Sequence, residues 1–127
     1  MSSVMFMICV GLLGGPASDH KPETLQVKTQ LAMVSWYGDG FDGRLMANGD
    51  RFDKDDPTTA AHKSLRFGTK VELLNPLNGQ TLIVEIKDRG PFKPGRTFDL
   101  SEAAAERLGF KETGLATLKV VRVIKPT

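Results

Sequence analysis

Two short apolar segments in the middle of the chain constrain its fold more than any other feature. Residues 70–74 and 81–86 are rich in β-forming side chains, and the Pro-Leu-Asn-Gly segment at 76–79 separates them with turn-forming residues. One face of the second segment carries Leu82, Val84 and Ile86. The pattern predicts an antiparallel hairpin with one buried face.

The rest of the chain is predicted to form further short strands connected by loops. Additional strands or extended segments are predicted at 31–37, 58–62 and 118–124. Between the first two of these, residues 38–56 form a long loop rich in Gly and Asp, and compact domains rarely carry such a loop without a use for it. Many short strands favour a closed barrel, because closure removes exposed edges.

One helix is predicted at residues 101–108. Asp99 or Ser101 caps its beginning, the alanines at 103–105 favour it, and Gly109 ends it. The fold class is therefore mainly β, with one or two short helices.

Composition limits the classes of function. With 127 residues the chain forms one domain, predicted at 31–125, and a monomer is expected. A net charge of +2 and the absence of a Lys/Arg run argue against nucleic acid as a partner. No metal or other cofactor is expected, because neither His62 nor the Asp-rich loop has a metal-ligand pattern around it.

The N-terminal segment resembles a secretory signal peptide. Residues 4–13 are apolar except for Gly11, and small residues precede a cleavage point after Ala17. No positive charge precedes the apolar run, although signal peptides usually carry one there. The alternatives are a misassigned start of the chain and an uncleaved anchor. Cys9 follows a large residue and does not fit a lipidation site. We predict a signal peptide at 1–17, a polar lead-in at 18–30, and a periplasmic or secreted protein associated with the cell envelope, with no membrane insertion beyond this segment.

The segment Lys-Asp-Arg-Gly-Pro-Phe at 87–92 is where we expect chemistry. Asp88 follows the predicted strand, and a Gly-Pro turn fixes the chain just after it. A turn aspartate that bonds nearby amides and a general acid/base explain these residues equally well.

Seven ordered motifs resemble the rare lipoprotein A family. They are Ser-Trp-Tyr-Gly at 35–38, Ala-Asn-Gly at 47–49, Thr-Ala-Ala-His at 59–62, Phe-Gly-Thr at 67–69, Asn-Gly at 78–79, Asp-Arg-Gly-Pro-Phe at 88–92 and Asp-Leu-Ser at 99–101. The resemblance covers residues 33–124. It implies a six-stranded double-psi β-barrel.

The same resemblance implies a lytic transglycosylase that acts on peptidoglycan. Such an enzyme cleaves between N-acetylmuramic acid and N-acetylglucosamine and forms 1,6-anhydro-N-acetylmuramic acid. Asp88 would protonate the glycosidic oxygen and then deprotonate the C6 hydroxyl. The alternatives are a non-catalytic, expansin-like polysaccharide binder that loosens the wall, and an interaction module at the wall.

The resemblance also assigns supporting roles. His62 would orient Asp88 or the sugar by hydrogen bonding. The alternative is that this lone histidine has a purely structural role. Asp50 replaces the glutamate usual in the family, in a stretch one residue longer than usual, and is either a second carboxylate or a loop residue.

The predicted substrate-binding residues are Trp36, Tyr37, Asn48, Arg89 and Phe92. Of the two residues Trp36 and Tyr37, we expect one to stack on sugar and one to fill the barrel end. Arg89 is more consistent with a clamp on a loop carboxylate such as Asp99 than with a substrate contact.

Overall fold

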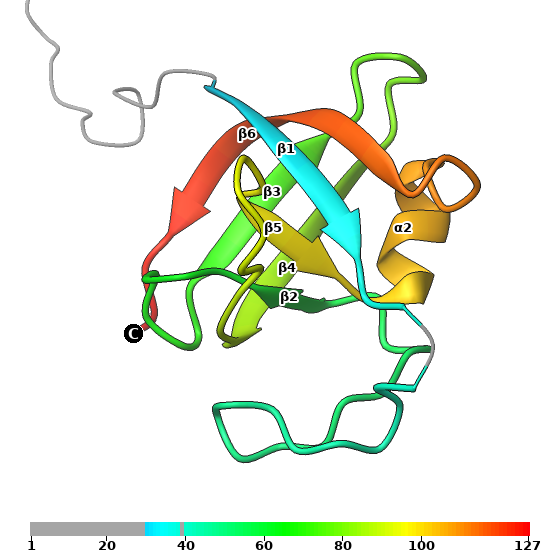
Figure 1. Cartoon of the computed structure of the whole chain (residues 1–127). Helices are drawn as coiled ribbons and strands as arrows, with labels where there is room; N and C mark the ends of the chain where they lie inside the picture. The colour runs from blue at the N-terminus through cyan, green and yellow to red at the C-terminus, as the bar shows by residue number, and fades with distance from the viewer. Residues whose placement is uncertain (1–29, 39) are drawn as a thin grey trace, which may run out of the picture.

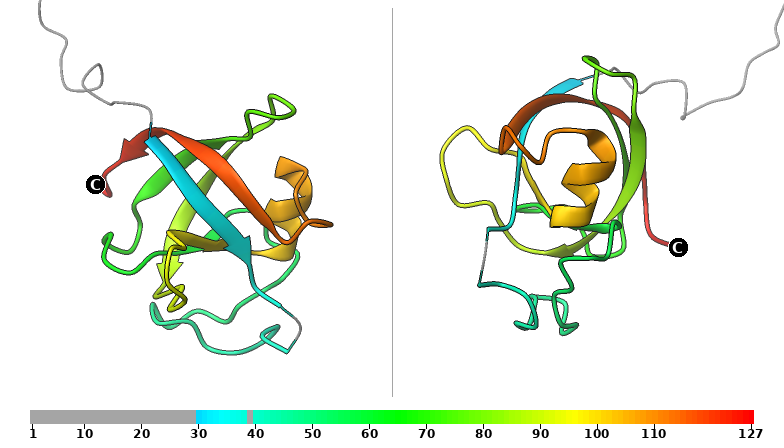
Figure 2. Two further views of the ribbon diagram at one scale, coloured as in Figure 1. Left: turned by 45° about the horizontal axis from the view of Figure 1, so that its top comes forward. Right: turned by 90° about the vertical axis from the view of Figure 1, so that its right-hand side faces the viewer.

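The structure is a computed structural model that describes residues 30–38 and 40–127. The predicted signal peptide at 1–17, and the predicted lead-in except for residue 30, lie outside the described residues. In the described part, six strands close into a barrel and a short helix covers one end of it (Figures 1 and 2). These elements are β1 (Gln30–Trp36), β2 (Thr59–Ala61), β3 (Lys70–Leu74), β4 (Thr81–Asp88), β5 (Phe98–Leu100), α2 (Glu102–Leu108) and β6 (Leu115–Ile124).

The strands follow the order β1-β5-β2-β4-β3-β6 around the barrel, and β6 pairs with β1 to close it. Two neighbouring pairs are parallel, β1 with β5 and β2 with β4, while the other four are antiparallel. The parallel pairs bring together the carboxyl ends of strands that are distant in sequence. The mainly β class and the closed barrel predicted from the sequence are confirmed.

The central hairpin forms as predicted. Lys70 pairs with Glu85 and Leu74 with Thr81, so the alternation along β4 is set by an antiparallel partner. Val84 and Ile86 are fully buried in the barrel core. Burying an aliphatic side chain of this size contributes about 1.5–3 kcal/mol, so the hairpin face is a main source of the barrel's stability.

Helix α2 begins and ends where the capping residues predict. The side chain of Ser101 accepts a hydrogen bond from the backbone N–H of Ala104 at 3.1 Å, so Ser101 and not Asp99 is the N-cap. Gly109 ends the helix in the left-handed conformation, with φ of 80°. Asn75, in the hairpin turn, donates its side-chain amide to the carbonyl of Leu108 at 2.7 Å. The turn of the hairpin thus provides a hydrogen-bond donor for a carbonyl at the end of the helix.

Strand β5 is a feature that the sequence did not predict. Phe98 and Leu100 are buried and Asp99 between them is half-buried, which is the alternation of a strand edge facing a core. Three residues are too few for this period to stand out from the start of the following helix. Asp99 therefore lies in a strand and is not part of the helix cap.

The long loop folds back on itself below the barrel (Figure 1). Leu45 and Arg51 form an isolated antiparallel bridge, closed by a turn in which Gly49 has φ of 98°. Met46 and Phe52 are buried against Tyr37. This small second core fixes the loop against the end of β1, where the groove described next is found.

Candidate active site

A groove of about 560 Å³ lies between the loop and the ends of β1, β4 and β5. Five of the eight predicted site residues line it: Trp36, Tyr37, Asp88, Arg89 and Phe92. The other three, His62, Asp50 and Asn48, are not part of its lining. Asp99 lines the same groove and was not predicted as a site residue.

The barrel register explains how the two aspartates reach one groove. Asp88 in β4 and Asp99 in β5 are both register partners of Ala61 in β2, one on each side. Ser35 in β1 is the register partner of Asp99. Ser35, Asp99, Ala61 and Asp88 thus form one row across four neighbouring strands. The β2–β4 register shifts between Ala60 and Ala61, and Asp88 and Asp99 both line the groove. The row thus presents two carboxylates side by side at one end of the barrel.

Three donors hold the Asp88 carboxylate. The hydroxyl of Tyr37 donates to Oδ2 at 2.7 Å, and the backbone N–H groups of Ala47 and Arg89 donate to Oδ1 at 2.9 and 2.8 Å. These donors come from the end of β1, from the long loop and from the start of the turn after β4. A carboxylate with bonds to both oxygens has a fixed direction, as a group engaged in proton transfer requires.

Tyr37 is itself fixed by aromatic packing. Its ring stacks on Phe52 with centroids 4.3 Å apart and meets the edge of Phe41 at 5.5 Å. Burial, together with the hydrogen bond to Asp88, raises the pKa of the Tyr37 hydroxyl well above its ordinary value. The hydroxyl therefore keeps its proton and acts as a donor to Asp88 at any physiological pH.

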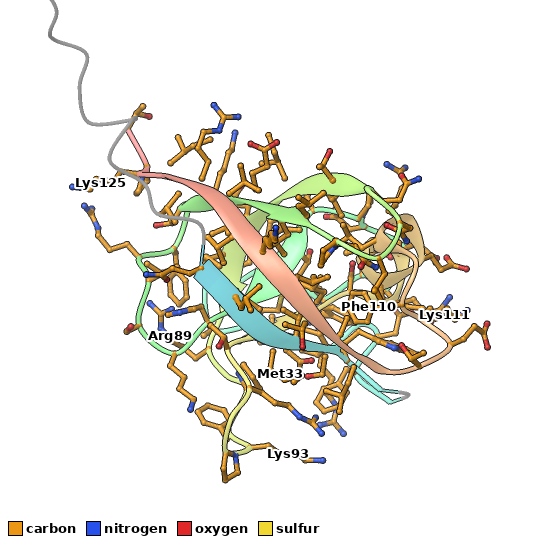
Figure 3. All side chains as sticks on the ribbon, turned by 90° about the horizontal axis from the view of Figure 1, so that it is seen from above. Met33, Arg89, Lys93, Phe110, Lys111 and Lys125 are labelled. Atoms are coloured by element: carbon orange, nitrogen blue, oxygen red, sulfur yellow. The ribbon has the colours of Figure 1, made fainter. Side chains whose placement is uncertain are left out.

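The environment of Asp99 differs from that of Asp88. Its Oδ1 accepts one hydrogen bond, from the hydroxyl of Ser35 at 2.9 Å. Burial is the largest influence on the Asp99 carboxyl and raises its pKa, and the negative charge of Asp88 adds to the rise. The Ser35 hydroxyl and the positive charges of Arg96 and Lys93 act in the opposite direction. Lys93 lies in the connection between β4 and β5 (Figure 3).

His62 supports the site through the backbone and a neighbouring loop. Its backbone N–H donates to the carbonyl oxygen of Asp88 at 3.2 Å, whereas its imidazole Nδ1 accepts the N–H groups of Ser64 and Leu65, both at 3.0 Å. Burial, reinforced by the charge of Arg89, lowers the pKa of His62, which favours the neutral ring that can accept at Nδ1. The imidazole and the Asp88 carboxylate do not hydrogen-bond in this structure.

The clamp predicted for Arg89 is present, but it holds main-chain carbonyls instead of a carboxylate. Its guanidinium donates to the carbonyl oxygens of His62 at 3.0 Å and Leu65 at 2.7 Å. The same group lies over the ring of Phe67, 4.1 Å from the centroid. Arg89 thereby ties the loop after β2 to the chain immediately after Asp88.

Asp50 and Asn48 belong to the turn that carries Ala47. The side-chain oxygen of Asn48 accepts the backbone N–H of Asp50 at 2.9 Å, and its amide donates to the Asp50 carboxylate at 3.1 Å. The backbone N–H of Asn48 also donates to the carbonyl of Lys87 at 3.2 Å. These contacts position the neighbouring Ala47 N–H, which reaches Asp88. Both side chains therefore lie in the turn that presents the Ala47 N–H to Asp88.

The remaining aromatic residues differ in exposure. Trp36 is half-buried against the barrel core, and its indole N–H donates to the carbonyl of Lys111 at 3.1 Å. Phe92 is 81% exposed at the groove, and Phe41, which the sequence analysis did not single out, is 42% exposed there. Two exposed phenyl rings at one groove are apolar platforms of the kind that stack on sugar rings.

Between residues 30 and 127, with residue 39 omitted, no three side chains of His, Cys, Asp or Glu are grouped so that they could hold a metal ion. No helix in that part of the chain is long and apolar enough to cross a membrane.

The closed barrel, its two parallel strand pairs and the carboxylate groove define the class as a double-psi β-barrel. Solved structures agree with this fold. A Streptomyces papain inhibitor superposes with a TM-score of 0.61 at 21% identity, covering 77% of this chain and 96% of the inhibitor. A Clavibacter michiganensis expansin in complex with cellohexaose has a TM-score of 0.58 at 20% identity, covering 79% of this chain and 52% of the expansin.

The family described as "Lytic transglycolase" matches residues 29–120, and the chain belongs to this family. The endolytic peptidoglycan transglycosylase RlpA of Rickettsia prowazekii is 42% identical over 104 residues, which are 80% of this chain and 32% of the relative. The RlpA of Neisseria meningitidis is 43% identical over 96 residues, 76% of this chain and 40% of the relative. The chain thus spans well under half the length of these relatives. The resemblance to the rare lipoprotein A family is confirmed.

Proposed function

We propose that this domain is a peptidoglycan lytic transglycosylase. It cleaves glycan strands between N-acetylmuramic acid and N-acetylglucosamine and leaves 1,6-anhydro-N-acetylmuramic acid at the new end. The family and the RlpA relatives support this proposal. The observation that carries it is the Asp88 carboxylate, which three donors fix in a groove of about 560 Å³.

The reaction requires two proton transfers and no water. The glycosidic oxygen takes up a proton as its bond to C1 of the muramic acid breaks, and the C6 hydroxyl of the same sugar attacks C1 and loses its proton. A positioned carboxylate is a suitable base for the C6 hydroxyl. Three donors hold the Asp88 carboxylate in one orientation in the groove, so we assign it to this proton. One carboxylate can in principle serve both transfers in turn.

The groove suits a glycan chain in shape and surface. Phe92 and Phe41 provide exposed rings, while Trp36 and Tyr37 close the floor from the end of β1. Tyr37 contributes through its bond to Asp88 as well as through its ring. Peptide-free glycan carries a free lactyl carboxylate on each muramic acid, and stem peptides carry carboxylates of their own. The positive charges of Arg44, Lys93 and Arg96 at the groove are compatible with either form of this substrate.

We also propose that the protein acts in the cell envelope, in the periplasm or outside the cell, where the proposed substrate is found. The apolar segment at 4–13 supports this location, because it has the length and composition of a signal-peptide core. N-terminal sequencing of the envelope fraction tests the proposal and is expected to begin near Ser18. An intact Met1 on a cytosolic protein would contradict it.

A second candidate function is non-catalytic binding to wall polysaccharide. The exposed Phe92 and Phe41 favour it, because stacking platforms serve a binder as well as an enzyme. Digestion of purified sacculi separates the two functions. We expect mass spectrometry to detect soluble fragments with 1,6-anhydro ends. Sedimentation with sacculi without any release of fragments would support the binder, and reducing ends alone would indicate a hydrolase.

A further inference from the structure

The groove holds a second carboxylate that the mechanism above does not use. Asp99 lines the groove, is half-buried in β5, and belongs to the same register row as Asp88. We propose that Asp99 is the proton donor to the glycosidic oxygen and that Asp88 is the base for the C6 hydroxyl. This inference rests on the proposed transglycosylase reaction.

The geometry places the two carboxylates on either side of a space of suitable size. Ala61 is the register partner of both, and its small side chain is fully buried between them. Neighbouring strands lie about 4.8 Å apart, so Cα atoms two strands apart are separated by roughly 10 Å. That spacing leaves room for a sugar between two side chains that both line the groove.

The hydrogen bonds separate the roles of the two residues. Asp88 accepts three donors, which suits a carboxylate that begins the reaction ionised. Asp99 accepts one, from Ser35, and one of its oxygens receives no donor from the described residues. That oxygen is available to carry a proton toward a substrate in the groove.

The charged and titratable groups around Asp99 are consistent with a donor. Ser35 faces it from β1 and Asp88 from the end of β4, while Arg96 and Lys93 approach from the connection before β5. Burial and the charge of Asp88 raise the pKa of the Asp99 carboxyl, and the cations only partly offset them. Pairs of acids whose environments differ in this way often divide the acid and base roles.

The proton balance of the reaction closes with these two residues. The carboxyl of Asp99 gives its proton to the glycosidic oxygen, which leaves as the hydroxyl of N-acetylglucosamine. The C6 oxygen forms the new bond to C1 and its proton passes to Asp88. Asp99 ends as a carboxylate and Asp88 as a carboxylic acid, and exchange with solvent restores the starting state. No co-reactant is consumed.

Two substrates test the assignment. Natural glycan has a poor leaving group and needs the acid, whereas an aryl glycoside of the N-acetylglucosaminyl-N-acetylmuramic acid disaccharide, such as the 4-methylumbelliferyl glycoside, does not. We expect Asp99→Asn to lower the rate on sacculi by a factor of about 10² to 10⁴. On the aryl glycoside it should stay within about tenfold of wild type, because a phenolate leaves without protonation. Asp88→Asn should lose activity on both substrates.

Asp55→Asn is the matched control, because Asp55 is an exposed carboxylate outside the groove. Folding of each variant is checked by its melting temperature. Wild-type rates of Asp99→Asn on sacculi would overturn the assignment, and so would equal losses on both substrates by a folded protein. The absence of any 1,6-anhydro product from wild type would instead refute the proposed reaction itself.

Discussion

Removing the hydroxyl of Tyr37 tests how much its hydrogen bond to Asp88 contributes to catalysis. Tyr37→Phe keeps the ring stacked on Phe52 and removes only the 2.7 Å bond to Asp88 Oδ2. A hydrogen bond to a charged group contributes about 1.5–3 kcal/mol. If that energy serves to orient the carboxylate in the transition state, the turnover number falls by a factor of about 10 to 150, since each 1.36 kcal/mol is tenfold.

The assay measures kcat and KM for the release of 1,6-anhydro fragments from purified glycan strands. We expect the loss to appear in kcat with KM nearly unchanged, because the Tyr37 hydroxyl is bonded to Asp88 and not free for substrate. Tyr37→Leu is the companion variant, since it also removes the stack and should lower the melting temperature further. A folded Tyr37→Phe protein with the wild-type kcat would refute this reasoning.

Three further predictions concern the groups around the two aspartates. Ser35→Ala removes the hydrogen bond that favours ionised Asp99, so the pKa of Asp99 should rise and the alkaline limb of the pH–rate profile should move to higher pH; an unmoved limb would count against Asp99 as the acid. His62→Ala should slow the reaction at least tenfold by releasing the loop held at Nδ1, and His62→Asn, whose Oδ1 can accept the same N–H groups, should recover much of the rate; an asparagine variant as slow as alanine would assign the imidazole a direct role. Asp50→Ala should lower activity modestly and Asp50→Glu should leave it unchanged or raise it, as measured on sacculi; full activity in the alanine variant would make Asp50 a loop residue only.

The elements that the sequence predicts best are those with a local signal. The hairpin has strict alternation and a turn between its strands, and its bounds at 70–74 are reproduced by β3. The helix has a cap residue at each end, and both Ser101 and Gly109 take those roles. In both cases the residues that determine the element lie within it or beside it.

The features that the sequence misses depend on contacts between distant residues. β5 is only three residues long, and its strand character comes from its neighbours β1 and β2. The bond from Tyr37 to Asp88 spans 51 positions and that from Ser35 to Asp99 spans 64. No local pattern encodes such pairs, because the parallel strand pairings of the barrel create them.

The residues of the candidate site also differ in whether a local sequence pattern predicts them. Asp88 could be predicted because it ends a recognisable strand and precedes a Gly-Pro turn. The partner of Arg89 was harder to predict, since backbone carbonyls carry no sequence signal. Asp99 does not stand out in the sequence as a site residue, because Phe-Asp-Leu before a serine resembles the start of a helix. The one local signal for it is its position between two large apolar residues, Phe98 and Leu100.

Asp88→Asn tests the central claim most directly. The amide preserves the size of the side chain and part of its hydrogen bonding but cannot take the C6 proton. Purified wild type and variant are incubated with sacculi, and soluble products are identified by mass spectrometry while melting temperatures establish folding. We predict 1,6-anhydro-N-acetylmuramic acid ends from wild type and a loss by a factor of about 10² to 10⁴ from a folded Asp88→Asn. A folded variant that releases these ends at the wild-type rate would contradict the assignment of Asp88.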